Sequence, residues 1–299
     1  MLNTSLGRAF GPELSTQHSD QHQMLTPDFL VIGAARAGST YLARNLATHP
    51  EVFIPKKKEL HYFDRNFEGD WSQYQQQFAD ARPSHNAIGE ATPTYMTSAD
   101  IANRIHERLP AAKLIAILRD PVDRAYSHYW NAVAEHDDAD AMTYEQKRQA
   151  YPFEKVLETR SRLVDDGLYA ENLEPFIDHF GKEQLLVLVF EEVVESPHTQ
   201  FQRVFRFLDV DDTFRSPLVD RRINSSSQKH GRSSLLLRLY NFATAYVRIP
   251  YIAKWIENVN EVSYPPMDGQ TRAELEKRFQ RPNQQLEQLL GRSLNHWSS

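Results

Sequence analysis

The 299-residue sequence contains no cysteine. This excludes disulfide bonds, cysteine-ligated zinc and a thiol nucleophile, and it removes any redox clue to the compartment. The sequence also lacks an uninterrupted apolar run of about 18 residues, the length that a membrane-spanning helix needs. The most apolar candidate, residues 235–256, is interrupted by two arginines, a proline and a lysine, and we interpret it as an amphipathic helix. We therefore predict no transmembrane span, while a peripheral membrane contact stays open.

Basic residues are in the minority, with 34 Lys and Arg against 40 Asp and Glu and a formal net charge of −6. Proteins that bind nucleic acid usually present a basic face, so we expect no nucleic-acid partner. Residues 1–27 are polar and lack the charged and apolar regions of a secretion signal. We expect a flexible tail over 1–27, one functional domain over 28–299, and a cytoplasmic protein.

What the chain does contain is a glycine-bounded turn between an apolar run and a helical pattern. Phe29–Ile32 predicts a buried strand, and Tyr41–Ala47 predicts a helix. The Gly-x4-Gly-Ser-Thr segment Gly33–Thr40 between them has the layout of a phosphate-binding loop, whose backbone N–H groups surround an anion at the positive end of a helix. A nucleoside-triphosphatase loop needs lysine after the second glycine, but Ser39 stands there. Arg36 is the cation inside this loop.

Strand and helix patterns alternate along the rest of the chain. Apolar runs predict strands over Lys113–Leu118 and Gln184–Phe190, with shorter extended segments at Glu51–Pro55 and Ala87–Ala91. Helical patterns cover residues 101–109, 122–133, 153–163, 169–180, 204–208 and 270–290. This alternation predicts a single α/β domain with a parallel central sheet flanked by helices. In such folds the site lies at the carboxyl ends of the strands.

A second motif follows the predicted strand that ends at Leu118. Arg119 comes directly after this strand, and Ser127 lies about two turns into the next predicted helix. A cation and a hydroxyl placed in this way could bind one phosphate. An ion pair of Arg119 with Asp120 or Asp123 is the structural alternative. Asp120 also resembles the metal-binding Asp of P-loop enzymes, although the missing loop lysine weakens that interpretation.

The third motif is Lys58–Asp64, which combines a carboxylate, a histidine and lysines. Glu59 is a candidate general base for a hydroxyl. A charged surface turn is the alternative that spacing alone favours.

An acidic stretch over residues 135–148 has little apolar pattern and predicts a surface insertion. Its carboxylates and His136 could bind a metal, but a solvated loop explains them as well, and we assign no metal site.

Together the three motifs resemble sulfotransferases that use 3′-phosphoadenosine-5′-phosphosulfate (PAPS). Ile32–Leu42 is similar to their 5′-phosphosulfate loop and Leu118–Tyr129 to their 3′-phosphate motif. Lys58–Asp64 is similar to the segment with the catalytic glutamate in heparan sulfate and bacterial carbohydrate-type sulfotransferases. Further similar segments are Phe190–Glu192, Phe205–Leu208, Gln228–Arg232 and Gly291–Trp297. The resemblance covers residues 28–298 and implies a P-loop-like sulfotransferase fold.

The resemblance implies sulfuryl transfer from PAPS to a hydroxyl of a carbohydrate, glycolipid or small alcohol, with adenosine 3′,5′-bisphosphate as the second product and no metal. The implied catalytic residues are Glu59 as base, Arg36 and His61. Asp64 joins Glu59 and His61 on the acceptor side. The implied cofactor-binding residues are Arg36, Ala37, Gly38, Ser39, Thr40, Tyr41, Arg119, Ser127, Lys229, Gly231 and Arg232.

The sequence departs from the family pattern at two cations. Most members have lysine where this chain has Arg36, and arginine keeps the charge but cannot donate a proton. The glycan enzymes have lysine where this chain has Ala91. A P-loop kinase or nucleoside triphosphatase, and a catalytically inactive nucleotide-binding protein, stay open as alternatives. The oligomeric state is not predicted.

Overall fold

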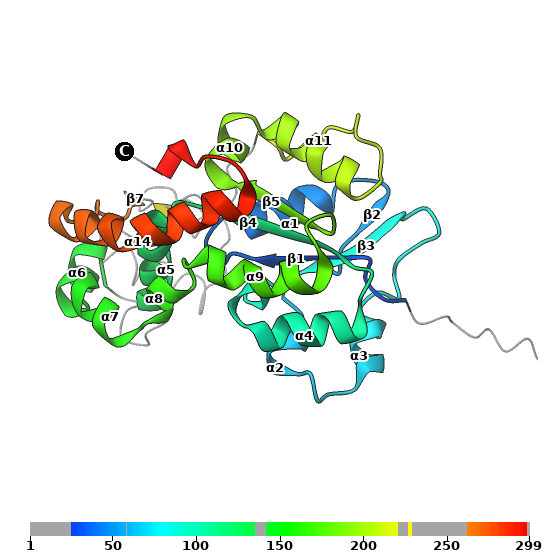
Figure 1. The fold of residues 1–299 in the computed structure, drawn as a ribbon, viewed down its shortest axis with the longest axis horizontal. Helices are drawn as coiled ribbons and strands as arrows, with labels where there is room; N and C mark the ends of the chain where they lie inside the picture. Colours follow the sequence, from blue (N-terminus) through cyan, green and yellow to red (C-terminus); the bar gives the residue numbers. More distant parts are fainter. Residues whose placement is uncertain (1–24, 58, 135–141, 221–226, 229–261, 298–299) are drawn as a thin grey trace, which may run out of the picture.

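The computed structural model describes residues 25–57, 59–134, 142–220, 227–228 and 262–297. At its centre is a five-stranded sheet in the order β2-β3-β1-β4-β5, and all neighbouring strands are parallel (Figure 1). This confirms the predicted α/β fold with a parallel central sheet. The strands are β1 (Phe29–Gly33), β2 (Val52–Phe53), β3 (Ala87–Ala91), β4 (Lys113–Leu118) and β5 (Leu185–Val189).

Helices cover both faces of the sheet because side chains of the buried strands alternate between two apolar clusters. Leu30 and Ile32 of β1 belong to the cluster on one face, and Phe29 and Val31 to the cluster on the other. The first face is covered by α2 (Tyr62–Arg65), α3 (Trp71–Gln76), α4 (Ala99–Arg108), α9 (Tyr169–Phe180) and the end of α14 (Gly269–Leu290). The second face is covered by α1 (Ser39–Leu46), α10 (Phe190–Glu195) and α11 (Pro197–Phe207).

A third apolar cluster lies off one end of the sheet, where α5 follows the carboxyl end of β4 (Figure 1). It joins α5 (Pro121–Ala134), α6 (Tyr144–Ala150), α7 (Phe153–Thr159) and α8 (Arg162–Asp165) to the first half of α14. The remaining elements are η1 (Tyr95–Thr97), η4 (Asn295–Trp297) and the antiparallel pair β6 (Ser227–Gln228) and β7 (Val262–Ser263).

The predicted helix over residues 153–163 is in fact two helices, α7 and α8. A long-range contact accompanies the break: the fully buried Arg124 of α5 donates a hydrogen bond to the carbonyl of Leu163. The helix predicted over residues 204–208 begins earlier, at Pro197, whose fixed φ suits a first helical turn.

Several expectations fall on residues outside the described ones. These are the amphipathic helix over 235–256, most of the tail, and residues 135–141 of the acidic stretch. Within the described part of the chain, no helix combines the length and the apolar character needed to cross a bilayer.

Candidate functional site

The Gly33–Thr40 loop joins the carboxyl end of β1 to the start of α1. Gly38 has φ 101°, and a Cβ there would lie 2.8 Å from the ring of Phe190, so only glycine fits. The first helical hydrogen bond runs from Leu42 N–H to Gly38 O over 3.0 Å. The N–H groups of residues 39–41 therefore precede the helical ladder, at the positive end of the helix. Backbone N–H groups in this arrangement could bind an anion.

The loop cation Arg36 is held against helix α5. Its Nε donates to Ser127 Oγ over 3.3 Å, and its Nη1 donates to Asn131 Oδ1 over 3.1 Å. Ser127 and Asn131 lie one turn apart on α5, which matches the fork of the guanidinium. The structure thus brings together Arg36 and Ser127, which the sequence placed in separate motifs.

Arg119 lies at the carboxyl end of β4, where several groups fix its position. Its guanidinium lies over the Phe190 ring, 5.2 Å from the centroid, and 3.9 Å from Asp123 Oδ2. The ion pair of Arg119 with Asp123, which the sequence offered as an alternative, is therefore present, but its N–O distance is long. Tyr169 Oη donates to the Arg119 carbonyl over 2.8 Å, which anchors the backbone at this point.

Asp120 caps the start of α5. Its Oδ1 accepts from the N–H groups of Val122 (2.8 Å) and Asp123 (3.2 Å), and its own N–H donates to Glu191 Oε1. Burial is the largest influence on this carboxyl group and raises its pKa to about 6. The carboxylate that resembled a metal ligand is thus engaged in capping.

The surroundings of Ser127 are strongly cationic. His128, the next residue, has its pKa lowered to about 4, first by burial and then by the charges of arginines that include Arg124 and Arg36. Arg124 is fully buried and lies 3.9 Å from Asp166 Oδ2. A phosphate near Ser127 would enter a positive potential.

The Glu59 segment forms a chain of polar side chains. His61 Nε2 lies 3.5 Å from Glu59 Oε2, and His61 Nδ1 lies 3.0 Å from Asp64 Oδ2. Thr94 Oγ1 donates to the same Asp64 oxygen over 2.6 Å. Glu59 and His61 both have left-handed backbone conformations, with φ 57° and 55°. The three predicted acceptor-side residues are therefore in contact, with His61 between two carboxylates.

The carboxyl end of β3 brings this segment beside the anion loop. Thr92 N–H donates to Val31 O of β1 over 3.1 Å. A Cβ on Gly33 would lie 2.7 Å from Met96 Cβ and 3.2 Å from the Pro93 carbonyl oxygen, so the residues that follow β3 are in close contact with the start of the loop. The Glu59 segment contacts the same residues, because Thr94 Oγ1 donates to Asp64 and Tyr62 N–H donates to Tyr95 Oη. Because β1 lies between β3 and β4, its loop has the Glu59 segment on one side and the Arg119 motif on the other.

Other predicted residues are placed differently. The Tyr41 hydroxyl donates to Val219 O over 2.5 Å and its ring packs edge-on against Phe201, so only its backbone N–H is available to a loop ligand. Ala37 is buried in the core, and Ser39 is nearly so. Lys229, Gly231 and Arg232 lie outside the described residues.

Sequence reasoning assigned no site role to Asn131, Thr94 or Glu90, although it matched the segment Gly89–Pro93 to one in the glycan enzymes. Asn131 follows Ser127 by four residues on a predicted helix, which is a local signal that could have identified it. Thr94 and Glu90 carry no such signal, because their partners come from other segments.

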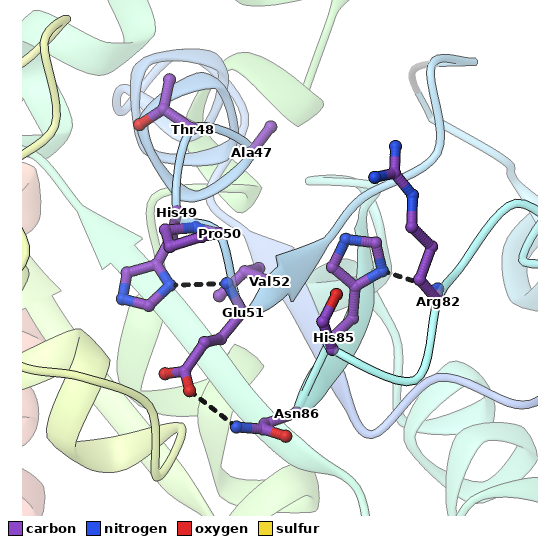
Figure 2. A pocket seen from close by; sticks show the side chains of 10 residues that line it. Ala47, Thr48, His49, Pro50, Glu51, Val52, Arg82, His85 and Asn86 are labelled. Carbon is purple, nitrogen blue, oxygen red and sulfur yellow. Dashed lines mark hydrogen bonds between the residues drawn. The ribbon is translucent and has the colours of Figure 1, made fainter.

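An open pocket of about 690 Å³ lies at the amino ends of β2 and β3, opposite to the carboxyl ends where the predicted site lies. Figure 2 shows its polar groups bonded to one another: Asn86 Nδ2 donates to Glu51 Oε1 over 2.8 Å, and Glu51 N–H donates to His49 Nδ1 over 3.1 Å. None of the predicted site residues that the structure describes lines it.

Comparisons with known proteins agree with this geometry. The family model described as "Sulfotransferase domain" matches residues 26–244. Heparan sulfate glucosamine 3-O-sulfotransferase 3A1 of Mus musculus is 28% identical over 192 residues, which are 63% of this chain and 47% of that protein. Bifunctional heparan sulfate N-deacetylase/N-sulfotransferase 3 of Mus musculus is 28% identical over 299 residues, 91% of this chain and 31% of that protein.

The crystal structure of a sulfotransferase from Alicyclobacillus acidocaldarius matches with a TM-score of 0.67 at 26% identity, covering 92% of this chain and 100% of that one. The chain spans about half or less of the length of these two curated relatives. Because the family model covers more than half of the chain, including all five strands of the central sheet, the chain belongs to the sulfotransferase domain family.

Proposed function

We propose that this chain transfers a sulfuryl group from PAPS to an acceptor hydroxyl, with Glu59 as general base. The observation that carries the proposal is the convergence at the end of β1: an anion loop whose Arg36 contacts Ser127 on one side, and the Glu59–His61–Asp64 chain on the other.

The residues of the chain fit this donor. Gly38 leaves the backbone open to a close approach, and the N–H groups of residues 39–41 with Arg36 would hold the phosphosulfate end. Arg119 and Ser127, in their cationic surroundings, would hold the 3′-phosphate. When bound, PAPS supplies a sulfuryl group on a phosphate that leaves as a stabilised anion.

The protein's own groups would act on the proton and on the developing charge. Glu59 would take the proton of the acceptor hydroxyl as the acceptor oxygen bonds to sulfur. His61, held by Asp64 and Thr94, would orient the Glu59 carboxylate. Arg36 and the N-terminus of α1 would stabilise negative charge on the sulfuryl and leaving oxygens. Arg36 keeps its proton at any working pH, so its role is electrostatic.

We propose a carbohydrate hydroxyl as the acceptor, ahead of a glycolipid or a small alcohol. The resemblance of the Glu59 segment to that of glycan enzymes supports this choice, as do relatives whose names specify heparan sulfate glucosamine. A P-loop kinase is disfavoured because Ser39 replaces the loop lysine and because Asp120 caps a helix.

The test combines labelled PAPS with a panel of sugars, glycolipids and alcohols, read by mass spectrometry with and without EDTA. Glu59→Gln should fold, bind adenosine 3′,5′-bisphosphate and lose turnover, while the exposed Glu68→Gln serves as the matched control and should keep it. Retained kcat in Glu59→Gln would move the base elsewhere. Nucleotide binding by the wild-type chain without transfer to any acceptor would indicate an inactive binding protein.

A further inference from the structure

Glu90 is a buried carboxylate that the proposed reaction does not use. It lies on β3 with 1% of its surface exposed. Its Oε1 accepts from the hydroxyls of Tyr95 (2.8 Å) and Tyr74 (3.1 Å), and its Oε2 accepts from Thr92 Oγ1 (2.6 Å). The backbone N–H of Leu60 lies near this carboxylate and favours its charged form. A buried carboxylate needs hydrogen-bond donors, and the three hydroxyls supply them.

The same network holds two consecutive backbone N–H groups of the Glu59 segment, and Leu60 lies beside Glu90. Tyr62 N–H donates to Tyr95 Oη over 3.0 Å, and His61 N–H has a long contact of 3.5 Å with Thr92 Oγ1. Because Tyr95 and Thr92 both donate to Glu90, one carboxylate orients the acceptors of both groups.

These N–H groups lie in a strained stretch of backbone. Glu59 and His61 have φ values of 57° and 55°, in the left-handed region that residues with a Cβ rarely occupy. Such conformations persist where surrounding contacts hold them, and they recur at functional sites. The direction of the Glu59 and His61 side chains therefore depends on the anchoring of residues 60–62.

We propose that Glu90 is a positioning residue for the general base: through Tyr95 and Thr92 it fixes the backbone of residues 60–62 and so aims Glu59 and His61 at the acceptor. This inference rests on the proposed function, and Glu90 itself acts only through the backbone that it anchors.

Two tyrosines on this carboxylate provide a matched pair of variants. Tyr95→Phe removes a donor to Glu90 and also the acceptor of Tyr62 N–H. Tyr74→Phe removes a donor to the same oxygen and leaves the backbone of residues 60–62 untouched. Both tyrosines are buried, and phenylalanine keeps the ring packing in each case. The pair thus separates damage to the carboxylate from loss of anchoring.

The experiment measures kcat, the affinity for adenosine 3′,5′-bisphosphate and the melting temperature of both variants. We expect Tyr95→Phe to lower kcat by roughly tenfold or more with nucleotide affinity unchanged, since small displacements of a reacting group cost large factors in rate. Tyr74→Phe should keep kcat within about twofold of wild type, since it removes no contact of the reacting groups. Glu90→Gln should behave like Tyr95→Phe, because an amide nitrogen cannot accept a hydrogen bond.

Equal kcat losses in the two tyrosine variants, or losses that follow their melting temperatures, would overturn the inference. So would an unchanged kcat in a folded Glu90→Gln. If the wild-type chain transfers no sulfuryl group, or if Glu59→Gln remains active, it is the proposed function that fails. If Glu59→Gln is inactive while folded Tyr95→Phe and Glu90→Gln keep full kcat, only the positioning role fails.

Discussion

Arg36 Nε donates a hydrogen bond to Ser127 Oγ over 3.3 Å, joining two residues that are 91 positions apart in the sequence. The contact links the loop after β1 to helix α5, and a second bond from the same guanidinium to Asn131 fixes its orientation. In the proposed donor site, Arg36 serves the phosphosulfate end and Ser127 the 3′-phosphate. The two ends of the nucleotide site are therefore coupled through one side chain.

This coupling predicts that lysine is a poor substitute at position 36. Arg36→Lys keeps the charge but loses the fork that reaches both Ser127 and Asn131. We expect nucleotide affinity to fall about tenfold, and we expect Arg36→Ala to lower kcat about 100-fold or more. Calorimetry and steady-state rates measure both effects. An Arg36→Lys variant with wild-type affinity would show that the paired contacts do not matter for binding.

Arg119→Ala should weaken binding of adenosine 3′,5′-bisphosphate by roughly 2 kcal/mol or more, because a charge-assisted contact in a largely buried site is lost. The loss should disappear with adenosine 5′-phosphate, which lacks the 3′-phosphate. The control is Arg206→Ala, which removes an exposed arginine of α11 that pairs with Asp212. Equal losses for the two nucleotides would contradict the assignment of Arg119 to the 3′-phosphate.

Gly38→Ala should destabilise the fold more than Gly291→Ala does. Both glycines have positive φ, at 101° and 66°, so each alanine has a backbone cost of about 1–2 kcal/mol. Only at Gly38 would the new Cβ also meet the Phe190 ring, at 2.8 Å. Urea unfolding compares the two variants, and equal losses would mean that Phe190 moves aside freely. Because Arg119 lies over Phe190, nucleotide affinity should fall in Gly38→Ala alone.

The sequence predicted the sheet well because its central strands are buried on both faces. Leu114 to Leu118 and the run in β1 are continuous apolar stretches, so their identity as parallel strands was visible. The ends of these strands then indicated where a candidate site would lie. The spacing of four residues from Ser127 to Asn131 was visible in the sequence, but the contact of Arg36 with both was not predictable, since it depends on how α5 packs against the loop.

Glu90 was equally hidden from sequence reasoning. A glutamate in the short run Ala87–Ala91 gives no local indication that its carboxylate is buried, since Tyr74 and Tyr95 come from other elements. The hydrogen bond from Arg124 to the Leu163 carbonyl has the same character, because Arg124 belongs to a different helix. The functional roles of the site residues remain predictions that the variants above test.

The raised pKa of Asp120 predicts an unusual pH dependence of the free energy of unfolding. Burial raises its pKa from the usual 3.8 to about 6, so the folded chain binds a proton more tightly than the unfolded chain. Between about pH 4 and pH 6 the folded state therefore holds more protons, and the free energy of unfolding falls as the pH rises. A pKa difference of this size corresponds to at most about 3 kcal/mol across the window.

Asp120→Asn should remove this dependence, because asparagine keeps an oxygen to cap α5 but does not titrate. The variant should gain stability relative to wild type as the pH rises from 4 to 6, as measured by urea unfolding at several pH values. Asp268 is the matched control: it caps α14 from an exposed position, and hydrogen bonds from the N–H groups of Thr271 and Gln270 lower its pKa. Its charged form stabilises the helix above pH 3.8, so Asp268→Asn should lose stability relative to wild type at neutral pH and approach it in acid. Because burial at Asp120 and backbone hydrogen bonds at Asp268 shift the pKa values of two capping carboxyl groups in opposite directions, pH profiles of the same sign would contradict burial as the cause.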